Sequence, residues 1–407
     1  MSECLLAKYQ SKIIFVLVFL LCPLSFFVPR SATWLLTIGG LLGIIICKSK
    51  VLKIVKLPFP LTALALIVWG GLSIFWSLDP RVSFMLFIRL FSIYILGISW
   101  YSLLKVQSQD DIQTTQFYLF LGIIVTFVLL IIDYLFSHPW QILTFKTSAK
   151  AFAPLALTIS MAVWPATQWL HAQYNSFVVI LFALSAVLFL LFIDCDTAPI
   201  GLMSGIFVGG LAYFSPKFVS RSGQFLTVIL ILSLPFAIHS LLTFERIHQI
   251  NNFVHNFSHI HRLYVWQNVS EKIQQNWIKG YGLDTSRNEA LGGEKMHWTM
   301  TTKEEELVPI NSKAIPMHPH NAPLQWWLEL GIIGALLGTL LNIQSLSFIS
   351  HYKGITVFTG ISLFVSSNFI AWVNLGFWQS WWLAALWILA SIFISSLPKE
   401  ESETHQN

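Results

Sequence analysis

The segment His318-Pro319-His320-Asn321 places two imidazoles and an amide within one short turn of chain. A histidine can act as a general base near neutral pH, because its ordinary pKa is about 6.5. The alternatives are surface histidines without a chemical role and a zinc site. Two histidines without a nearby cysteine, aspartate or third histidine form a poor zinc site, so the sequence predicts no metal here.

Arginines supply a second kind of chemistry. Arg262 opens a segment with helical spacing that carries Trp266, and an arginine at a helix start can present a planar fork to a phosphate or pyrophosphate. Arg287 is a similar but weaker candidate. For both residues, the alternative is a solvated charge at a helix end.

Arg89 stands inside an apolar run and is the third cationic candidate. A charge within a membrane span is costly and usually faces a polar cavity or a partner. Snorkelling to the outer interface is the alternative, and the sequence does not separate the two.

The composition restricts the kind of protein that positions these residues. Of 407 residues, 55% are hydrophobic and 11% are charged, against roughly 25% charged in soluble domains. So few polar residues could not cover so large an apolar core, which argues against a soluble enzyme, a disordered chain and a nucleic-acid binder. The four cysteines form no CxxC pair and indicate no disulfide framework.

Apolar runs of roughly the 17–25 residues that cross a bilayer recur along the chain. They predict an all-α polytopic membrane protein. We predict twelve spans, at residues 13–29, 32–47, 57–77, 82–104, 115–136, 151–170, 176–194, 198–214, 223–242, 323–350, 354–374 and 377–397. Spans one to nine therefore fill residues 1–242, spans ten to twelve fill 323–397, and 398–407 form a polar tail.

Lysines set the predicted orientation, because cytoplasmic loops are enriched in lysine and arginine. With a cytoplasmic N-terminus, the run Lys48, Lys50, Lys53 and Lys56 lies inside, and the short outer loops hold only Arg30, Arg81, Lys146 and Lys150. Twelve spans then return the C-terminus to the cytoplasm as well.

Residues 243–322 form one long polar loop between spans nine and ten, which this topology places outside. The loop contains His318, His320 and Arg262, and its tryptophans argue against disorder throughout. Leu263, Trp266, Val269 and Ile273 recur at helical spacing. We therefore predict an outer loop of short helices that carries the candidate site.

Three stretches in this order resemble the O-antigen ligase and polymerase superfamily of bacterial envelope glycosyltransferases. The first is Trp76-Ser77-Leu78-Asp79-Pro80 leading to Arg89, similar to W-S-x-x-P before a span with an arginine. The second is Arg262-x-x-x-Trp266, then Ile273 and Gly280-Tyr281-Gly282, similar to R-x-x-x-W…I…P-x-x-G-x-G. The third is His318-x-His320-Asn321-x-x-Leu324-Gln325…Glu329-x-Gly331-Ile332-Ile333-Gly334, similar to H-x-H-N-x-x-L-Q-x-x-x-E-x-G-x-x-G.

The resemblance implies transfer of a glycan from undecaprenyl diphosphate to an acceptor hydroxyl at the periplasmic face of the bacterial inner membrane. It gives His320 the role of the base, and Arg262, with Arg89 as a second candidate, the role of binding the diphosphate. His318, Asn321, Trp266 and Arg287 would support the site. Arginine would replace the metal of many glycosyltransferases, so we expect no cofactor.

No motif in the sequence identifies the acceptor of the glycan. The leading hypothesis is an O-antigen ligase acting on the lipid A–core oligosaccharide in lipopolysaccharide biosynthesis. The alternatives are an O-antigen polymerase of the same superfamily, a protein O-oligosaccharyltransferase and, last, a twelve-span transporter.

The sequence also departs from the family pattern. Many ligases carry a Ser-Arg pair where this chain reads Asp196-Thr197-Ala198, so a second diphosphate contact is either missing or supplied by Arg89 or Lys150. The proline usual before Gly280 is also absent.

Overall fold

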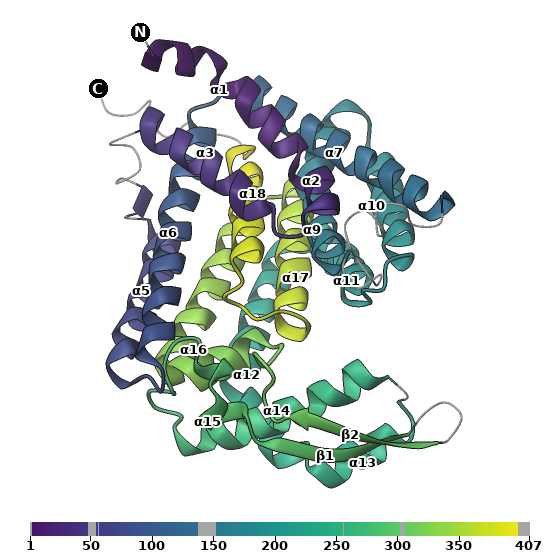
Figure 1. Ribbon diagram of the computed structural model, residues 1–407. Helices are drawn as coiled ribbons and strands as arrows, with labels where there is room; N and C mark the ends of the chain where they lie inside the picture. The colour runs from purple at the N-terminus through teal and green to yellow at the C-terminus, as the bar shows by residue number, and fades with distance from the viewer. Residues whose placement is uncertain are drawn as a thin grey trace.

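Apart from one β-hairpin, the chain is built from helices, which form a bundle with a small subdomain at one end (Figure 1). The computed structural model describes residues 2–47, 54–55, 57–136, 152–254, 256–301 and 306–397. The predicted tail 398–407 and Lys150 lie outside these residues. The helices of the bundle are α1 (Ser2–Phe19), α2 (Leu21–Phe27), α3 (Ala32–Cys47), α5 (Pro58–Leu72), α6 (Pro80–Lys105), α7 (Gln109–Leu135), α9 (Ala153–Gln173), α10 (Ser176–Leu191), α11 (Thr197–Phe214), α12 (Pro216–Leu241), α16 (Ala322–Ile349), α17 (Gly354–Val373) and α18 (Ser380–Ser395).

Among the described residues, seven helical segments are long and apolar enough to cross a membrane. They are α5 with the 3₁₀ turn that follows it (Ser73–Trp76), α6, α7, α11, α12, α16 and α17. The bent pair α1 and α2 would add an eighth span, and α3, α10 and α18 are shorter apolar helices. The chain is therefore an all-α protein with several candidate spans, while the count of twelve stays a prediction.

Helix α9 lies in the core of the bundle, with every side chain from Leu155 to Thr167 buried. It contacts α7, α10, α11, α17 and α18. Its Trp164 indole donates a hydrogen bond to Ser366 of α17, with 2.9 Å between Nε1 and Oγ. This contact satisfies the one polar atom of a large buried side chain.

Glycines spaced four residues apart let α11 lie close against α17. A Cβ on Gly205 would lie 2.5 Å from the Ser366 hydroxyl oxygen, so only glycine fits there. The Ser366 and Ser362 hydroxyls donate to the carbonyls of Gly201 and Gly205, each at 2.8 Å. Small residues and serine bonds of this kind hold helices together in an apolar environment, and they fix the start of α11 beside the end of α17.

The subdomain contains α13 (Phe244–Asn251), α14 (Phe257–Gln275), a 3₁₀ turn (Thr285–Arg287), α15 (Glu289–Gly292) and the strands β1 (Lys295–Thr301) and β2 (Leu307–Lys313). The strands are antiparallel, with Trp298 opposite Ile310. Trp298 packs with Ile247, Ile260 and Tyr264 in a small core of its own. The expectation of short helices alone was wrong for 295–313, where only Trp298 is buried in β1 and the alternation that signals a strand is weak.

Helix α16 contains a break at Gly331, where φ is 64° and ψ is −159°. This conformation is essentially restricted to glycine. The break leaves backbone groups of α16 without their usual helical partners, so other segments must bond them. The predicted continuous span 323–350 therefore consists of two helical pieces, and the joint between them lies next to the candidate site.

Candidate active site

The turn before α16 presents the two histidines. Asn321 is the N-cap of α16, and its side-chain oxygen accepts the Leu324 N–H at 3.0 Å. Pro323 in the first helical turn favours a helix start at this point. His320 just before the cap has a φ of 55°, and Asp284 is the other described residue besides glycine with positive φ. Strained backbone of this kind is concentrated at functional sites.

The ring of His320 is oriented by the segment that follows α17. Its Nδ1 lies 2.6 Å from the carbonyl oxygen of Asn374. A carbonyl only accepts hydrogen bonds, so Nδ1 carries the proton and the neutral ring keeps its lone pair on Nε2. Burial lowers the pKa of His320 to about 4, with the positive charge of Arg262 acting in the same direction. His320 is therefore neutral at pH 7 and has the protonation state of a base.

His318 lies edge-on to His320, with ring centroids 4.2 Å apart. Its Nδ1 accepts the backbone N–H of His320 at 3.3 Å, and its Nε2 lies 3.4 Å from the amide nitrogen of Gln379. Burial lowers the pKa of His318 to about 3, and the charges of His320, Arg287 and Arg262 add to that effect. Because Nδ1 accepts the His320 N–H, a proton on that nitrogen would break this bond, so the contact favours the neutral ring of His318.

Helix α14 brings Arg262 to this turn. The indole N–H of Trp266 donates to the Pro319 carbonyl at 2.8 Å, so α14 is tied to the residue between the two histidines. Arg262 lies one helical turn before Trp266 and thus on the same face of α14. The spacing Arg-x-x-x-Trp is explained in this way: the tryptophan fixes the helix and the arginine faces the histidines.

Arg262 is only partly exposed, and no hydrogen bond or ion pair from its guanidinium appears among the described residues. Burial lowers the pKa of Arg262, while the nearby Cys195 and Asp196 oppose that effect. A half-buried guanidinium without a bonded partner retains five N–H donors. It is well suited to bind an anionic ligand next to His320.

Arg287 is bonded to the carboxylate of Asp284, and Arg89 acts on the same group through its charge. Arg287 Nε donates to Asp284 Oδ1 at 2.8 Å, and the Arg287 side chain stays 48% exposed. Burial raises the pKa of Asp284, and the positive charges of Arg287 and then Arg89 act against that rise. Arg89 therefore lies near enough for its charge to act on Asp284, although no hydrogen bond or ion pair joins the two within the described part of the chain.

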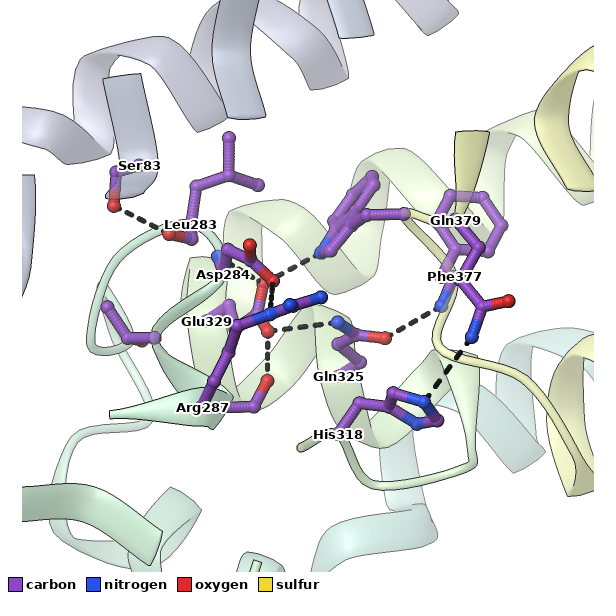
Figure 2. Close-up of polar contacts among 12 residues, drawn as sticks. Ser83, Leu283, Asp284, Arg287, His318, Gln325, Glu329, Phe377 and Gln379 are labelled. Carbon is purple, nitrogen blue, oxygen red and sulfur yellow. Dashed lines mark hydrogen bonds and ion pairs between the residues drawn. The ribbon is translucent and has the colours of Figure 1, made fainter. Parts of the chain in front are cut away.

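Glu329 of α16 lies next to Asp284 and is completely buried. Its carboxylate accepts the backbone N–H of Asp284 at 2.8 Å, the Gln325 amide at 2.9 Å and the Trp378 indole at 2.7 Å, and the Ser286 hydroxyl is a fourth donor. Figure 2 shows these contacts, with Asp284, Arg287, Glu329 and Gln325 in one polar cluster. One side chain thus links the 282–287 loop to both α16 and the loop before α18.

Backbone bonds close the joint at Gly331. The carbonyls of Leu328 and Glu329 accept the N–H groups of Tyr281 and Gly282 at 2.9 and 2.8 Å. The Leu330 carbonyl accepts the Trp69 indole at 2.9 Å. A Cβ on Gly280 would lie 2.5 Å from the carbonyl carbon of Glu329. The segments Gly280-Tyr281-Gly282 and Glu329-Leu330-Gly331 therefore pack directly against each other through their backbones.

The stretch Trp76–Pro80 completes this joint. The Leu78 N–H donates to the Tyr281 carbonyl at 3.1 Å, and the Ser83 hydroxyl donates to the Leu283 carbonyl at 2.5 Å. Asp79 caps α6 by accepting the Val82 N–H at 3.1 Å. The structure thus brings together all three motifs of the sequence, which lie far apart along the chain.

Sequence reasoning missed the segment between α17 and α18. Asn374 orients His320 through its carbonyl, and its side-chain amide donates to Thr197 Oγ1 at 2.9 Å, at the place where a Ser-Arg pair was expected. Gln379 approaches His318. A backbone carbonyl leaves no signal in a sequence. Glu329 was visible in the third motif, but its role was not.

No group of three or more histidine, cysteine, aspartate or glutamate side chains that could hold a metal ion occurs within the described ranges. His318 and His320 thus have no third ligand of these types there. A structural zinc site requires further ligands of this kind.

Comparisons with known proteins agree with the motifs. A profile of the O-antigen ligase family matches residues 179–338. The "Putative polysaccharide ligase" of Rickettsia felis is 27% identical over 300 residues, covering 72% of this chain and 69% of that protein. "Putative polysaccharide ligase RT0347" of Rickettsia typhi is 28% identical over 318 residues, with the same coverage. No solved structure matches the chain.

A shorter and more similar match lies in "Putative polysaccharide ligase RC0486" of Rickettsia conorii, which is 36% identical over 96 residues, 23% of this chain and 21% of that protein. The family profile includes α14, Glu329 and the histidine turn, whereas Trp378 and Asn374 lie beyond its end. The motifs, the profile over residues 179–338 and these relatives lead to one conclusion: together they support the resemblance of the chain to the O-antigen ligase superfamily.

Proposed function

We propose that this protein is an O-antigen ligase. It transfers a glycan from undecaprenyl diphosphate to the lipid A–core oligosaccharide at the periplasmic face of the inner membrane. The observation that carries the proposal is the pairing of a neutral His320, protonated on Nδ1, with the unpartnered guanidinium of Arg262 on the neighbouring helix. Glycan transfer from a diphosphate requires one base and one anion-binding group, and this site contains both.

The reaction follows from these two groups. Nε2 of His320 takes the proton of the acceptor hydroxyl as its oxygen attacks the anomeric carbon of the donor sugar. The new glycosidic C–O bond forms while the bond from the anomeric carbon to the diphosphate breaks. The leaving group departs as undecaprenyl diphosphate from the opposite face, so the anomeric configuration inverts.

Arginine stabilises the negative charge that develops on the diphosphate. A guanidinium presents two parallel N–H donors to phosphate oxygens, in a geometry that lysine does not offer. Arg262 is the nearer group to the histidines, and Arg89 is the second candidate for this role. A cation that is already in place when the donor binds reduces the reorganisation needed during the reaction.

The test uses a strain that lacks the gene, restored with wild type, His320→Ala or Arg262→Ala, with protein levels compared. Loss of the lipopolysaccharide ladder with accumulation of undecaprenyl-linked long chains is the result expected for a ligase. Core carrying only single repeat units would replace the ligase by a polymerase. A normal ladder in both variants would overturn the site, and an unaltered ladder after deletion would show that O-antigen is not the substrate.

A further inference from the structure

Glu329 bonds three of the segments that surround the site. It accepts bonds from the 282–287 loop, from Gln325 one turn earlier on α16 and from Trp378 before α18. Gln325 in turn accepts the Phe377 N–H at 2.8 Å. The carboxylate thus holds the loop that carries Arg287 against the segment that carries Asn374 and Gln379 (Figure 2).

The four partners of Glu329 match the hydrogen-bonding capacity of a carboxylate. A backbone N–H, an indole N–H, a side-chain amide and a hydroxyl all donate, and a carboxylate is an acceptor with about four lone-pair sites. Gln325 cannot turn its amide around, because its oxygen is already bonded by Phe377. A glutamine at position 329 would therefore place an NH₂ group against at least one donor.

The turn that Glu329 holds is strained. Asp284 has a φ of 60°, a conformation that costs a non-glycine residue about 1–3 kcal/mol unless the surroundings enforce it. The Glu329 carboxylate bonds the N–H of Asp284 itself, and the Ser286 hydroxyl two residues later. In the same turn, the Asp284 carboxylate accepts a hydrogen bond from Nε of Arg287.

Arg287 has the position and the free donors of a ligand-binding residue. Only its Nε is bonded among the described contacts, and nearly half of its side chain is exposed. Its positive charge lowers the pKa of His318, as does that of Arg262. The two guanidiniums therefore both act on the histidine pair, one from the 282–287 loop and one from α14.

We propose that Glu329 is a positioning residue, which holds the Asp284–Arg287 turn so that Arg287 supplies the second positive charge for the donor's diphosphate. The inference rests on the proposed function and deepens it. Arg287 then takes the place of the arginine that is missing at Asp196-Thr197-Ala198. Two guanidiniums would match the charge of a diphosphate better than Arg262 alone.

The experiment measures binding and needs no acceptor. The full-length protein in detergent is titrated with decaprenyl diphosphate, and the Kd is compared for wild type, Arg262→Gln, Arg287→Gln, Glu329→Gln and the double variant Arg287→Gln/Glu329→Gln. Removing one charge-assisted contact should weaken binding roughly tenfold or more. Glu329→Gln should weaken it similarly, and the double variant should bind no more weakly than Arg287→Gln.

A structural role for Glu329 alone predicts a different pattern. The losses in the double variant would then multiply, because independent effects add in free energy. Thr339→Val is the matched control: Thr339 is also buried in α16, but its hydroxyl bonds only the Ala335 carbonyl of its own helix. It should leave the Kd unchanged, and melting curves check that each variant is folded.

If Glu329→Gln does not fold, Ser286→Ala removes one donor to the carboxylate and leaves every charge in place. It should weaken binding a few-fold in wild type and have no effect in the Arg287→Gln background. Binding that is unaffected by Arg287→Gln but weakened by Arg262→Gln would overturn this inference and leave the proposed function standing. If wild type does not bind the lipid diphosphate, both fail.

Discussion

At the scale of single residues, the site is defined by how protons are held. His320 donates a hydrogen bond from Nδ1 to the Asn374 carbonyl, which leaves Nε2 with its lone pair, and Nδ1 of His318 accepts the His320 N–H. Both contacts favour the neutral form of the ring. This is the arrangement expected when a histidine must accept a proton from a hydroxyl, because an imidazolium has no lone pair to offer.

The first prediction concerns the pH dependence of transfer. Because the pKa of His320 is lowered to about 4, kcat/KM should fall only as the pH drops through about 4, where the ring becomes protonated. Arg262→Gln removes a positive charge that lowers this pKa, so the acid limb should move to higher pH. The measurement is a pH–rate profile of both proteins; an acid limb near 6.5 in wild type would contradict the lowered pKa of His320, and a profile without an acid limb in the range from about 3 to 7 would contradict its role as the base.

The second prediction concerns stability. The pKa of His318 is about 3 in the folded protein and about 6.5 when unfolded, so between these values the unfolded chain binds more protons. Stability should be complete above pH 6.5 and should fall by up to about 1.4 kcal/mol per pH unit for this group as the pH decreases. His318→Asn should reduce the slope of melting temperature against pH, whereas His351→Asn, at an exposed position, should not.

At the scale of elements, the joint at Gly331 connects two motifs that the sequence shows only as separate strings. A Cβ at Gly331 would collide with the Ile278 carbonyl, and its φ of 64° disfavours any side chain. The irregular backbone is tolerated because the surrounding segments bond its carbonyls. The joint therefore depends on residues from three distant parts of the chain.

This leads to the third prediction, for Gly331→Ala. It should destabilise the protein by at least about 1–3 kcal/mol, from the backbone conformation alone. Gly210→Ala is the control, because a Cβ there has no atom within 4 Å and the residue lies within helix α11. Melting in detergent should show a clear loss for the first variant and none for the second; equal melting temperatures would mean that the break is not required.

Local signals predicted much of these elements. The apolar runs predicted most helices of the bundle, and the helical spacing from Leu263 to Ile273 predicted α14. Position 331 was missed, since a glycine within an apolar run is compatible with an unbroken helix. The bonds of Tyr281 to Leu328 and of Asn374 to His320 were also missed. Backbone pairing between distant segments does not depend on side-chain type, so it leaves no pattern to find.

At the scale of the whole molecule, the site lies at one end of the bundle, with the subdomain, while α1 begins at the other end (Figure 1). Helix α6 runs between these ends: Leu78, just before it, is bonded to the 280–283 segment, and its last residue is Lys105. A helix of 26 residues is about 39 Å long. That length exceeds the roughly 30 Å of a bilayer core.

The fourth prediction follows for topology. With Cys4 replaced by serine and the buried Cys22, Cys47 and Cys195 left in place, Glu289→Cys and Lys105→Cys introduce single exposed thiols. A membrane-impermeant maleimide should label position 289 in cells with a permeabilised outer membrane, and position 105 only after lysis. The opposite pattern would place the site in the cytoplasm and exclude a periplasmic transferase.

The broken helix also has a consequence for biogenesis. While α16 enters the bilayer, the carbonyls at its break need partners, because an unpaired carbonyl in lipid costs several kcal/mol. Two of the partners, Tyr281 and Gly282, leave the ribosome before α16 does, and Trp69 leaves earlier still. The order of synthesis thus provides donors for the backbone carbonyls of Leu328, Glu329 and Leu330 before α16 is made, whereas the side chains of Gln325 and Glu329 receive Phe377 and Trp378 only later.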